Sequence, residues 1–463
     1  MTLRRLLLAV TAGIGADAAP AGPAAPASVP APANFAGDVI ANLWSWNWRS
    51  VTAECTDHLG PAGFGAVWVA PPAESLRHPS GTWWDVYQPY SYELTSRFGT
   101  ETEFTEMIEA CHRAGLAVFT DAVINHTAAL TGVGYAGTEL ADKYDPPMYD
   151  RDDYHVDECP NQISRWTDAW EVQHCELLGL PDLATERRAV RDRIAGYLDS
   201  QLALGVDGFR IDAAKHIPAA DLTAIYARLA STWSGAPPFI FHEVFPGGPA
   251  EPEDYFAAGA VLDFDYADRI KTAVLGDISI LATLDQRVLP PEHSVTFVTN
   301  HDTERNRRHL SYEHGATTVL ANVFQLAWPH GRPTIYSGFE WATRDQGPPN
   351  DAGFVTDTDC GAGWVCLHRD PAIVAMTAWH NAVGAAPVTN WQSPAAGVIG
   401  FRRGTGFVAL NNGDESGELT FTTGLADGSY CNVIDDCATT VDVVDGTAEL
   451  VLAATTAVAV LAE

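Results

Sequence analysis

The stretch Gly208-Phe-Arg-Ile-Asp212 is a short apolar run that ends in a carboxylate, and it follows a stretch of helical period, Arg187–Leu204. Alternation of such runs is typical of βα units, in which each helix crosses back over a parallel sheet. Between Phe35 and about Leu367 the pattern repeats, and eight strands predict a closed (β/α)8 barrel. The expected strands are Val39–Leu43, Ala66–Ala70, Ala117–Asp121, Gly208–Asp212, Phe239–Glu243, Ala260–Phe264, Ser294–Val298 and Pro333–Tyr336, and the helices between them include Glu103–Arg113 and Ala219–Leu229.

Two regions interrupt or follow this alternation. Residues 127–182 are rich in Gly, Pro, Asp and Tyr, and so long an irregular connection is usually functional. We expect an inserted domain there, closed by a Cys159–Cys175 disulfide. From residue 385 the chain forms short alternating segments separated by turns, which predict a C-terminal antiparallel β-sandwich. The predicted domains are 35–126 with 183–384 for the barrel, 127–182 for the insertion and 385–463 for the sandwich.

The N-terminal residues 1–34 have the pattern of a secretory signal peptide followed by an Ala/Pro-rich leader. Arg4-Arg5 precedes an apolar stretch, Leu6–Ala16, and small residues follow. The arginine pair leaves both the general and the twin-arginine export routes open. Eight cysteines without a CxxC motif indicate disulfides formed in an oxidising compartment, with Cys360–Cys366 and Cys431–Cys437 close enough in sequence for local pairs. We therefore expect a secreted, extracellular protein.

The charge of the chain excludes several classes of partner. With 59 acidic and 27 basic residues the formal net charge is −32, which disfavours nucleic acid and anionic membrane surfaces. No apolar run after the leader is long enough to span a bilayer. We expect a neutral polymer as the partner and a monomeric protein.

Three carboxylates stand at the ends of expected strands: Asp212, Glu243 and Asp302. Strand ends of a barrel meet at one rim, so the three side chains are predicted to share a site. Arg210 lies two residues before Asp212 and on the same face, which favours an ionised nucleophile. Glu243 follows Phe239-Ile-Phe and precedes Val244-Phe245, an apolar setting that favours a protonated acid. Retaining glycoside hydrolysis needs such a pair.

Four short segments give the chain a family resemblance: Asp121-Ala-Val-Ile-Asn-His126, Gly208–His216, Phe241-His-Glu-Val244 and Phe297-Val-Thr-Asn-His-Asp302. With these segments in this order the chain resembles the α-amylases of glycoside hydrolase family 13, nearest to secreted actinobacterial and animal enzymes. The resemblance implies endo-cleavage of α-1,4-glucosidic bonds in starch and maltooligosaccharides with retention of configuration. By the same resemblance Asp212 is the nucleophile, Glu243 the general acid/base and Asp302 the transition-state stabiliser.

The resemblance also implies a substrate site and a metal site. Trp83, Trp84, Tyr87 and Gln88 match the aromatic platform on which sugar faces stack. Structural Ca²⁺ is implied, with side-chain ligands Asn125 and Asp182 and backbone carbonyls from Gln173 and His216, because hard oxygen ligands suit this ion. Residues that match hydrogen-bonding positions toward sugar hydroxyls or catalytic carboxylates are His126, Arg210, Lys215, His216 and His301.

The chain departs from the family at Thr334 and over residues 303–307. Arg210 and Asn300 match two residues of the chloride site found in some relatives, but Thr334 stands where the second arginine is expected, which argues against chloride activation. Thr303-Glu-Arg-Asn-Arg307 replaces the Gly-rich mobile loop of the animal enzymes. Alternatives are a transglycosylating or oligosaccharide-specific member of the superfamily and a non-catalytic carbohydrate-binding protein. Retention of all three acids disfavours the last, since binding alone needs no poised acid.

Overall fold

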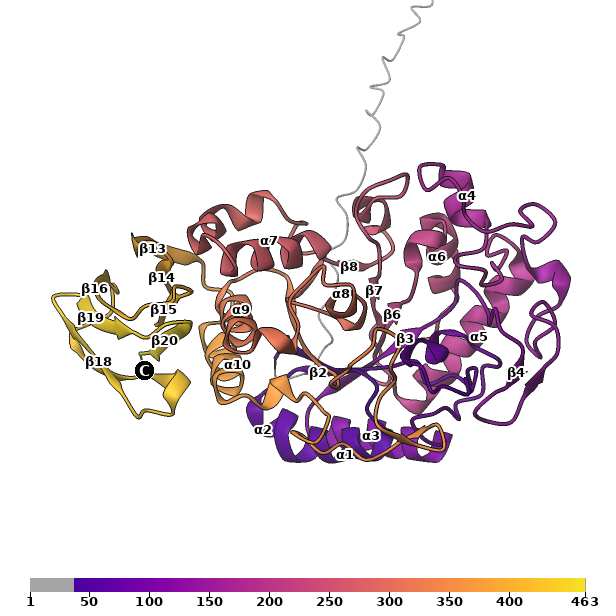
Figure 1. Ribbon diagram of the computed structural model, residues 1–463, viewed down its shortest axis with the longest axis horizontal. Helices are drawn as coiled ribbons and strands as arrows, with labels where there is room; N and C mark the ends of the chain where they lie inside the picture. The colour runs from indigo at the N-terminus through magenta and orange to yellow at the C-terminus, as the bar shows by residue number, and fades with distance from the viewer. Residues whose placement is uncertain (1–36, 463) are drawn as a thin grey trace, which may run out of the picture.

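The computed structural model describes residues 37–462, so the predicted signal peptide and leader lie outside the described residues. A closed barrel of eight parallel strands forms the centre of the molecule, in the order β1-β10-β9-β8-β7-β6-β3-β2 (Figure 1). All eight predicted strands are present, which confirms the (β/α)8 barrel. The strands are β1 Ile40–Leu43, β2 Ala66–Val69, β3 Ala117–Ala122, β6 Gly208–Ile211, β7 Phe239–His242, β8 Ala260–Leu262, β9 Ser294–Phe297 and β10 Arg332–Ser337.

Helices surround the barrel, and their ends follow local capping signals. Thr100 and Glu103 form a capping box at the start of α3, and Gly205 ends α5 with a φ of 109°, a left-handed conformation that favours glycine. Helix α6 ends at Tyr226, short of the predicted Leu229. The α-helices are α1 Trp48–Glu54, α2 Gly60–Ala62, α3 Glu101–Arg113, α4 Ala169–His174, α5 Arg188–Leu204, α6 Ala219–Tyr226, α7 Phe264–Val274, α8 His301–Arg305, α9 Ala316–Ala327 and α10 Pro371–Val383.

Shorter helical turns join these elements. The predicted strand Ala260–Phe264 ends early, at Leu262, because the Asp263 carboxylate accepts from the Tyr266 N–H and begins α7. Cys55–Leu59 is a π-helical turn, η1. The 3₁₀ turns are η2 Trp83–Tyr87, η3 Arg151–Asp153, η4 Ala214–His216, η5 Pro252–Tyr255, η6 Ile278–Gln286, η7 Tyr312–His314, η8 Leu367–Arg369 and η9 Val433–Asp435.

The segment between residues 127 and 182 has little regular structure and is joined to the barrel rim at both ends. It contains the two-residue strands β4 Gly132–Val133 and β5 Glu139–Leu140 together with η3 and α4. A β-bridge pairs His126 with Asp182, so the chain leaves and re-enters the barrel at one place. In Figure 1 this segment lies at the opposite end of the molecule from the C-terminal strands. The domain boundaries at 126/127, 182/183 and 384/385 stay predictions.

The C-terminal region consists of two antiparallel four-stranded sheets, β13-β14-β15-β20 and β16-β19-β18-β17, as expected. Phe407, Phe421 and Leu450 pack in its own core. Trp379 of α10 donates its indole N–H to the Val460 carbonyl and so joins this region to the barrel. The strands are β13 Val388–Ala395, β14 Val398–Arg403, β15 Gly406–Asn411, β16 Gly417–Thr422, β17 Gly428–Cys431, β18 Thr440–Val444, β19 Thr447–Leu452 and β20 Thr456–Leu461; β11 Asn350–Asp351 and β12 Phe354–Val355 form a separate hairpin.

Four disulfides use all eight cysteines of the chain. Cys159–Cys175 closes the inserted segment, and the local pairs Cys360–Cys366 and Cys431–Cys437 are present as predicted. Cys55–Cys111 joins η1 to α3. Within residues 37–462, no helix combines the length and apolar character needed to cross a membrane.

Candidate active site

The three acids predicted from the sequence line one cavity of about 680 Å³ at the carboxyl end of the barrel. Asp212 is the residue after strand β6, and Glu243 is the residue after the neighbouring strand β7. Their backbone N–H groups donate to the carbonyls of Ala122 and Ile211 on the adjacent strands. Asp302 lies in the first turn of α8, after β9. The cavity is also lined by predicted substrate residues, namely Trp83, Trp84, Tyr87, Gln88, His126, Lys215, His216 and His301.

Arg210 lies beneath the cavity, fully buried, and its guanidinium contacts both acids. Nη1 donates to Asp212 Oδ1 at 2.7 Å, and Nη2 is 2.7 Å from Glu243 Oε1 in an ion pair without hydrogen-bond angles. The Glu243 Oε2 atom accepts from the Ala213 N–H at 2.9 Å. The sequence predicted a cationic neighbour for Asp212 and an apolar setting for Glu243. The structure differs in part, because Arg210 contacts both acids. The apolar flanks of Glu243 could be seen in the sequence, whereas this shared contact could not.

Burial raises the pKa of Asp212 and of Glu243, and Arg210 opposes the shift at both. Burial, followed by the negative charge of Glu243, raises the pKa of Asp302 to about 8, although its side chain remains 32% exposed at the cavity wall. The three carboxylates lie near a single buried cation. Ionisation of all three at once is therefore unfavourable, because one positive charge cannot balance three negative charges. The site therefore retains a proton near neutral pH, which a general acid requires.

Asp121 anchors Tyr87, one of the residues that line the cavity. Its carboxylate accepts from the Trp68 indole N–H at 2.7 Å and from the Tyr87 hydroxyl at 2.8 Å, and burial raises its pKa to about 6. The Tyr87 ring stacks on His301 with an interplanar angle of 9° and a centroid distance of 5.3 Å. Asp121 was not among the predicted site residues, although its place at the end of the expected strand Ala117–Asp121 was the available signal.

Two histidines of the cavity are neutral. His126 donates from Nε2 to the Tyr87 carbonyl at 3.0 Å, and His216 donates from Nδ1 to the Val172 carbonyl at 2.8 Å. Burial lowers the pKa of each to about 4. Each ring therefore keeps one nitrogen as an acceptor. The ring of His301 is also stacked on Trp44, and burial lowers its pKa well below the ordinary value.

The remaining predicted platform residues are anchored by backbone contacts. Trp83 donates its indole N–H to the Arg344 carbonyl, and Gln88 Oε1 accepts from the N–H groups of Ala129 and Leu130. The Trp84 ring packs at a tilt against His78. These contacts fix the rings along one wall of the cavity.

Lys215 lines the cavity, and its ammonium contacts the main chain. Its ammonium donates to three main-chain carbonyls, those of Phe245, Gly247 and Ala250, at 2.6, 2.6 and 2.9 Å. An ammonium has three N–H donors, so in this structure none is left for a sugar hydroxyl.

Two further residues of the cavity were missed by the sequence analysis. Trp166, from the inserted segment, lines the cavity and is 52% exposed. Arg305 belongs to a basic run, Arg305, Arg307, Arg308 and His309, whose pattern indicates a solvated or substrate-side loop. It is 5% exposed, and its guanidinium lies over the rings of Trp44, Trp83, Phe339 and Trp341. A Trp in an irregular segment and an Arg in a charged run give little sequence signal, because only the fold brings the rings to them.

The predicted metal ligands lie where the inserted segment meets the barrel. The Leu183 N–H donates to the Asn125 carbonyl beside the His126–Asp182 bridge, which brings Asn125 and Asp182 together. Asp182 Oδ1 is buried without a hydrogen-bond partner, while Oδ2 contacts His155 Nδ1 at 2.7 Å. The His216 side chain contacts the carbonyl of Val172, the residue before Gln173, so the segments that carry Gln173 and His216 are adjacent.

An orphaned buried carboxylate oxygen fits a cation, and the oxygen set fits Ca²⁺. Among the described residues no group of three or more His, Cys, Asp or Glu is arranged to hold a metal. An ion at this place would therefore be held mainly by amide and carbonyl oxygens.

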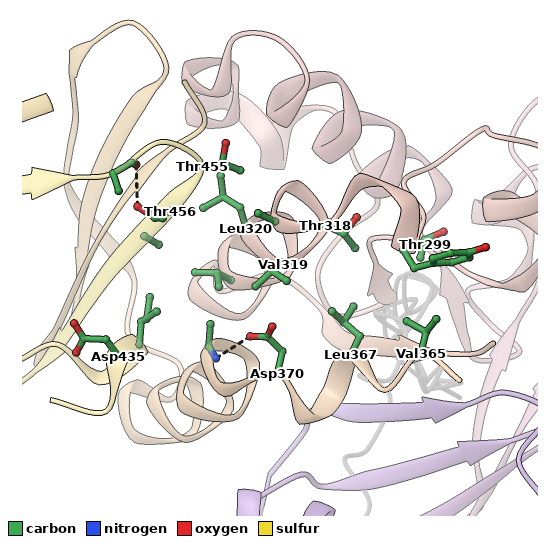
Figure 2. A pocket seen from close by; sticks show the side chains of 18 of the residues that line it. Thr299, Thr318, Val319, Leu320, Val365, Leu367, Asp370, Asp435, Thr455 and Thr456 are labelled. Atoms are coloured by element: carbon green, nitrogen blue, oxygen red, sulfur yellow. Dashed lines mark hydrogen bonds between the residues drawn. The ribbon is translucent and has the colours of Figure 1, made fainter. Parts of the chain in front are cut away.

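A second cavity, of about 740 Å³, lies between the barrel helices and the C-terminal sheets (Figure 2). Its wall includes Val319 and Leu320 of α9 and Thr455 and Thr456 of the C-terminal region. Asp370, also in this wall, accepts from the Ala372 N–H and begins α10. None of the three predicted catalytic acids lies here, so size alone does not identify the site.

Comparison with known proteins agrees with this geometry. Residues 51–234 match the family model described as alpha amylase, catalytic domain, and residues 389–463 match alpha amylase, C-terminal all-beta domain. The chain is 44% identical over 432 residues to an alpha-amylase of Streptomyces violaceus, covering 91% of this chain and 73% of that protein. It is 37% identical to the alpha-amylase of Tenebrio molitor, covering 87% and 90%. The solved alpha-amylase I of Eisenia fetida superposes with a TM-score of 0.89 at 30% identity, covering 92% and 98%.

Proposed function

Since the chain belongs to the α-amylase family and is a glycoside hydrolase, we propose that it is a secreted, endo-acting α-amylase. Its substrates are starch and maltooligosaccharides, cleaved at internal α-1,4 bonds with retention of configuration. The observation that carries the proposal is the meeting of Asp212, Glu243 and Asp302 in one cavity above Arg210.

The proposed reaction has two displacements. In the first, the Asp212 carboxylate attacks the anomeric carbon while Glu243 gives its proton to the departing glycosidic oxygen. The bond to that oxygen breaks, and a glucosyl ester of Asp212 forms. In the second, Glu243 removes a proton from water, the resulting oxygen attacks the same carbon, and Asp212 is released as a carboxylate. Arg210 supports the anionic nucleophile before attack and after release.

Asp302 completes the acid set and is proposed to bind hydroxyls of the distorted sugar ring. Its carboxyl oxygens, at the wall of the cavity, can accept from sugar hydroxyls. Trp83, Trp84 and Tyr87 offer ring faces, and Trp166 extends the aromatic lining on the side of the inserted segment. A solved structure of a variant of α-amylase I from Eisenia fetida is a complex with maltohexaose, which supports a maltooligosaccharide as ligand.

Ca²⁺ is proposed as a structural ion on Asn125, Asp182 and the carbonyls of Gln173 and His216. Bound there, it would neutralise Asp182 and hold the inserted segment against the barrel. Since Asn125 directly precedes His126, which lines the cavity, loss of the ion would act on the cavity wall and on stability. We propose no chloride requirement, because the Thr334 hydroxyl donates to the Thr296 carbonyl where relatives supply an arginine.

The test is digestion of soluble starch by the purified mature protein. We expect a rapid fall in viscosity, mixed maltooligosaccharides and products released as the α-anomer. Transfer products or a single short sugar would instead favour the transglycosylating or oligosaccharide-specific alternative. Binding without turnover would favour a non-catalytic carbohydrate-binding protein.

A further inference from the structure

The chain has only three lysines, Lys143, Lys215 and Lys271, and all three ammonium groups donate to main-chain carbonyls. Lys143 contacts the Gly179 carbonyl, and Lys271 contacts those of Arg307 and Arg308. Lys215 differs from the other two, because its three carbonyl partners all belong to the loop that follows Glu243.

The loop is shaped to present these carbonyls. Gly247 and Gly248 have φ angles of 90° and 98°, a region that residues with a Cβ rarely adopt. The Gly247 N–H donates to the Glu251 carboxylate, which closes the loop behind the ammonium. A compact ammonium suits three converging carbonyls, whereas the planar fork of an arginine does not.

The segment that carries Lys215 also holds Glu243 at two other points. The Ala213 N–H donates to Glu243 Oε2, and the Lys215 N–H donates to the Glu243 carbonyl at 3.3 Å. Ala213 takes a φ of 49°, a left-handed conformation that is unfavourable for an alanine. This segment follows Asp212 directly in the chain. Its contacts with Glu243 therefore fix where Glu243 lies relative to Asp212.

We propose that Lys215 is a positioning residue that fixes the general acid Glu243 against the nucleophile Asp212 by clamping the loop from Phe245 to Ala250. The inference rests on the proposed function. Lys215 then acts through Glu243 and the loop.

The decisive measurement is the dependence of kcat/KM on the leaving group. A series of aryl α-maltosides, whose phenols differ in pKa, carries no sugar on the leaving-group side. Poor leaving groups need the proton of Glu243, and good ones do not. In Lys215→Met we expect kcat/KM to fall at least tenfold for the poorest leaving group and less than threefold for the best. The dependence of kcat/KM on the pKa of the phenol should therefore become steeper, as in Glu243→Gln.

Two further variants separate this effect from general damage. Lys271→Met removes a carbonyl clamp far from Glu243 in sequence and should keep the wild-type dependence. Lys215→Cys can be alkylated selectively with 2-bromoethylamine, because all eight native cysteines are in disulfides. The product restores an ammonium at nearly the length of lysine, and we expect it to recover the wild-type dependence. Lys215→Arg should recover it only in part, and melting curves of all variants report on folding.

Each outcome decides the inference. An equal fall across the aryl series, or a rise in KM confined to long maltooligosaccharides, would overturn the positioning role and favour a substrate contact. An unchanged Lys215→Met enzyme, or an alkylated Lys215→Cys enzyme that does not recover, would also overturn it. If the wild type hydrolyses neither starch nor any aryl maltoside, the proposed function itself fails, which is a different result.

Discussion

Two cavities of similar size, about 680 and 740 Å³, differ in what their walls can do. The cleft at the barrel rim gathers three acids around a buried arginine, and each acid has a raised pKa. The cavity against the C-terminal sheets presents mainly aliphatic side chains and hydroxyls; of its acids, Asp370 caps a helix and Glu304 accepts from the Tyr336 hydroxyl. Several ionisable groups held close together in one buried site therefore indicate function, whereas cavity volume does not.

The largest contrast should come from replacing one acid in each cavity by its amide. We expect Glu243→Gln to lower kcat on starch by about 10³-fold or more, because the proton donor is lost, with little change in maltooligosaccharide affinity. Asp370→Asn should retain wild-type kcat, since asparagine also caps helices. Steady-state kinetics and calorimetric binding measure both. Wild-type turnover by Glu243→Gln would remove the catalytic assignment.

Large-to-small substitution at the second cavity should affect stability and not catalysis. Leu320 is buried in its wall, and Leu320→Ala should lower the free energy of unfolding by about 2–5 kcal/mol. We expect kcat/KM on maltoheptaose to stay within twofold of the wild type at a temperature where both are folded. Denaturant titration gives the first value. A loss of kcat/KM larger than tenfold would show that this cavity is linked to the cleft.

Chelation should act where the inserted segment meets the wall of the cleft, and should lower stability. We expect excess EDTA to lower the melting temperature by about 5 °C or more, because a bound ion stabilises the folded state by mass action. Asp182→Asn should melt lower without chelator and shift little with it, whereas Asp142→Asn, at an exposed acid of the same segment, should behave as the wild type. A melting curve of the wild type that EDTA leaves in place would remove the calcium proposal.

The smallest effect concerns Glu304, which lines the second cavity beside the cleft residue Arg305. Burial raises its pKa to about 7, although Arg305 and the Tyr336 hydroxyl oppose the shift. Between pH 4.5 and 7 the folded chain keeps a proton that the unfolded chain loses, so this group makes stability fall as pH rises. Glu304→Gln should therefore lose less stability than the wild type over that range. Glu292→Gln, at an exposed position, should run parallel to the wild type in melting curves taken at each pH.

Much of the fold could be predicted because its signals are local. The eight barrel strands are apolar runs that can be recognised in the sequence. Asp212 and Glu243 each stand directly after one of these runs, so the same pattern predicted that both acids lie on the rim of the barrel. Errors arose at element ends, where one side chain decides: the Asp263 cap ended β8 two residues early. The neutral histidines were beyond prediction, because their pKa values depend on burial and on carbonyls distant in sequence.

By itself the sequence determined the barrel, the family and the order of the acids. These features depend on periodicity and short motifs, which involve residues close together in the chain. Only the tertiary structure decided how those acids are held. In the folded chain Arg210 contacts the carboxylates of Asp212 and Glu243, and the Lys215 ammonium donates to three carbonyls. The Arg305 guanidinium packs against four aromatic rings. The physical reason is that a buried charge takes its partners from whatever the fold brings near, and closure of the barrel joins segments far apart in the chain.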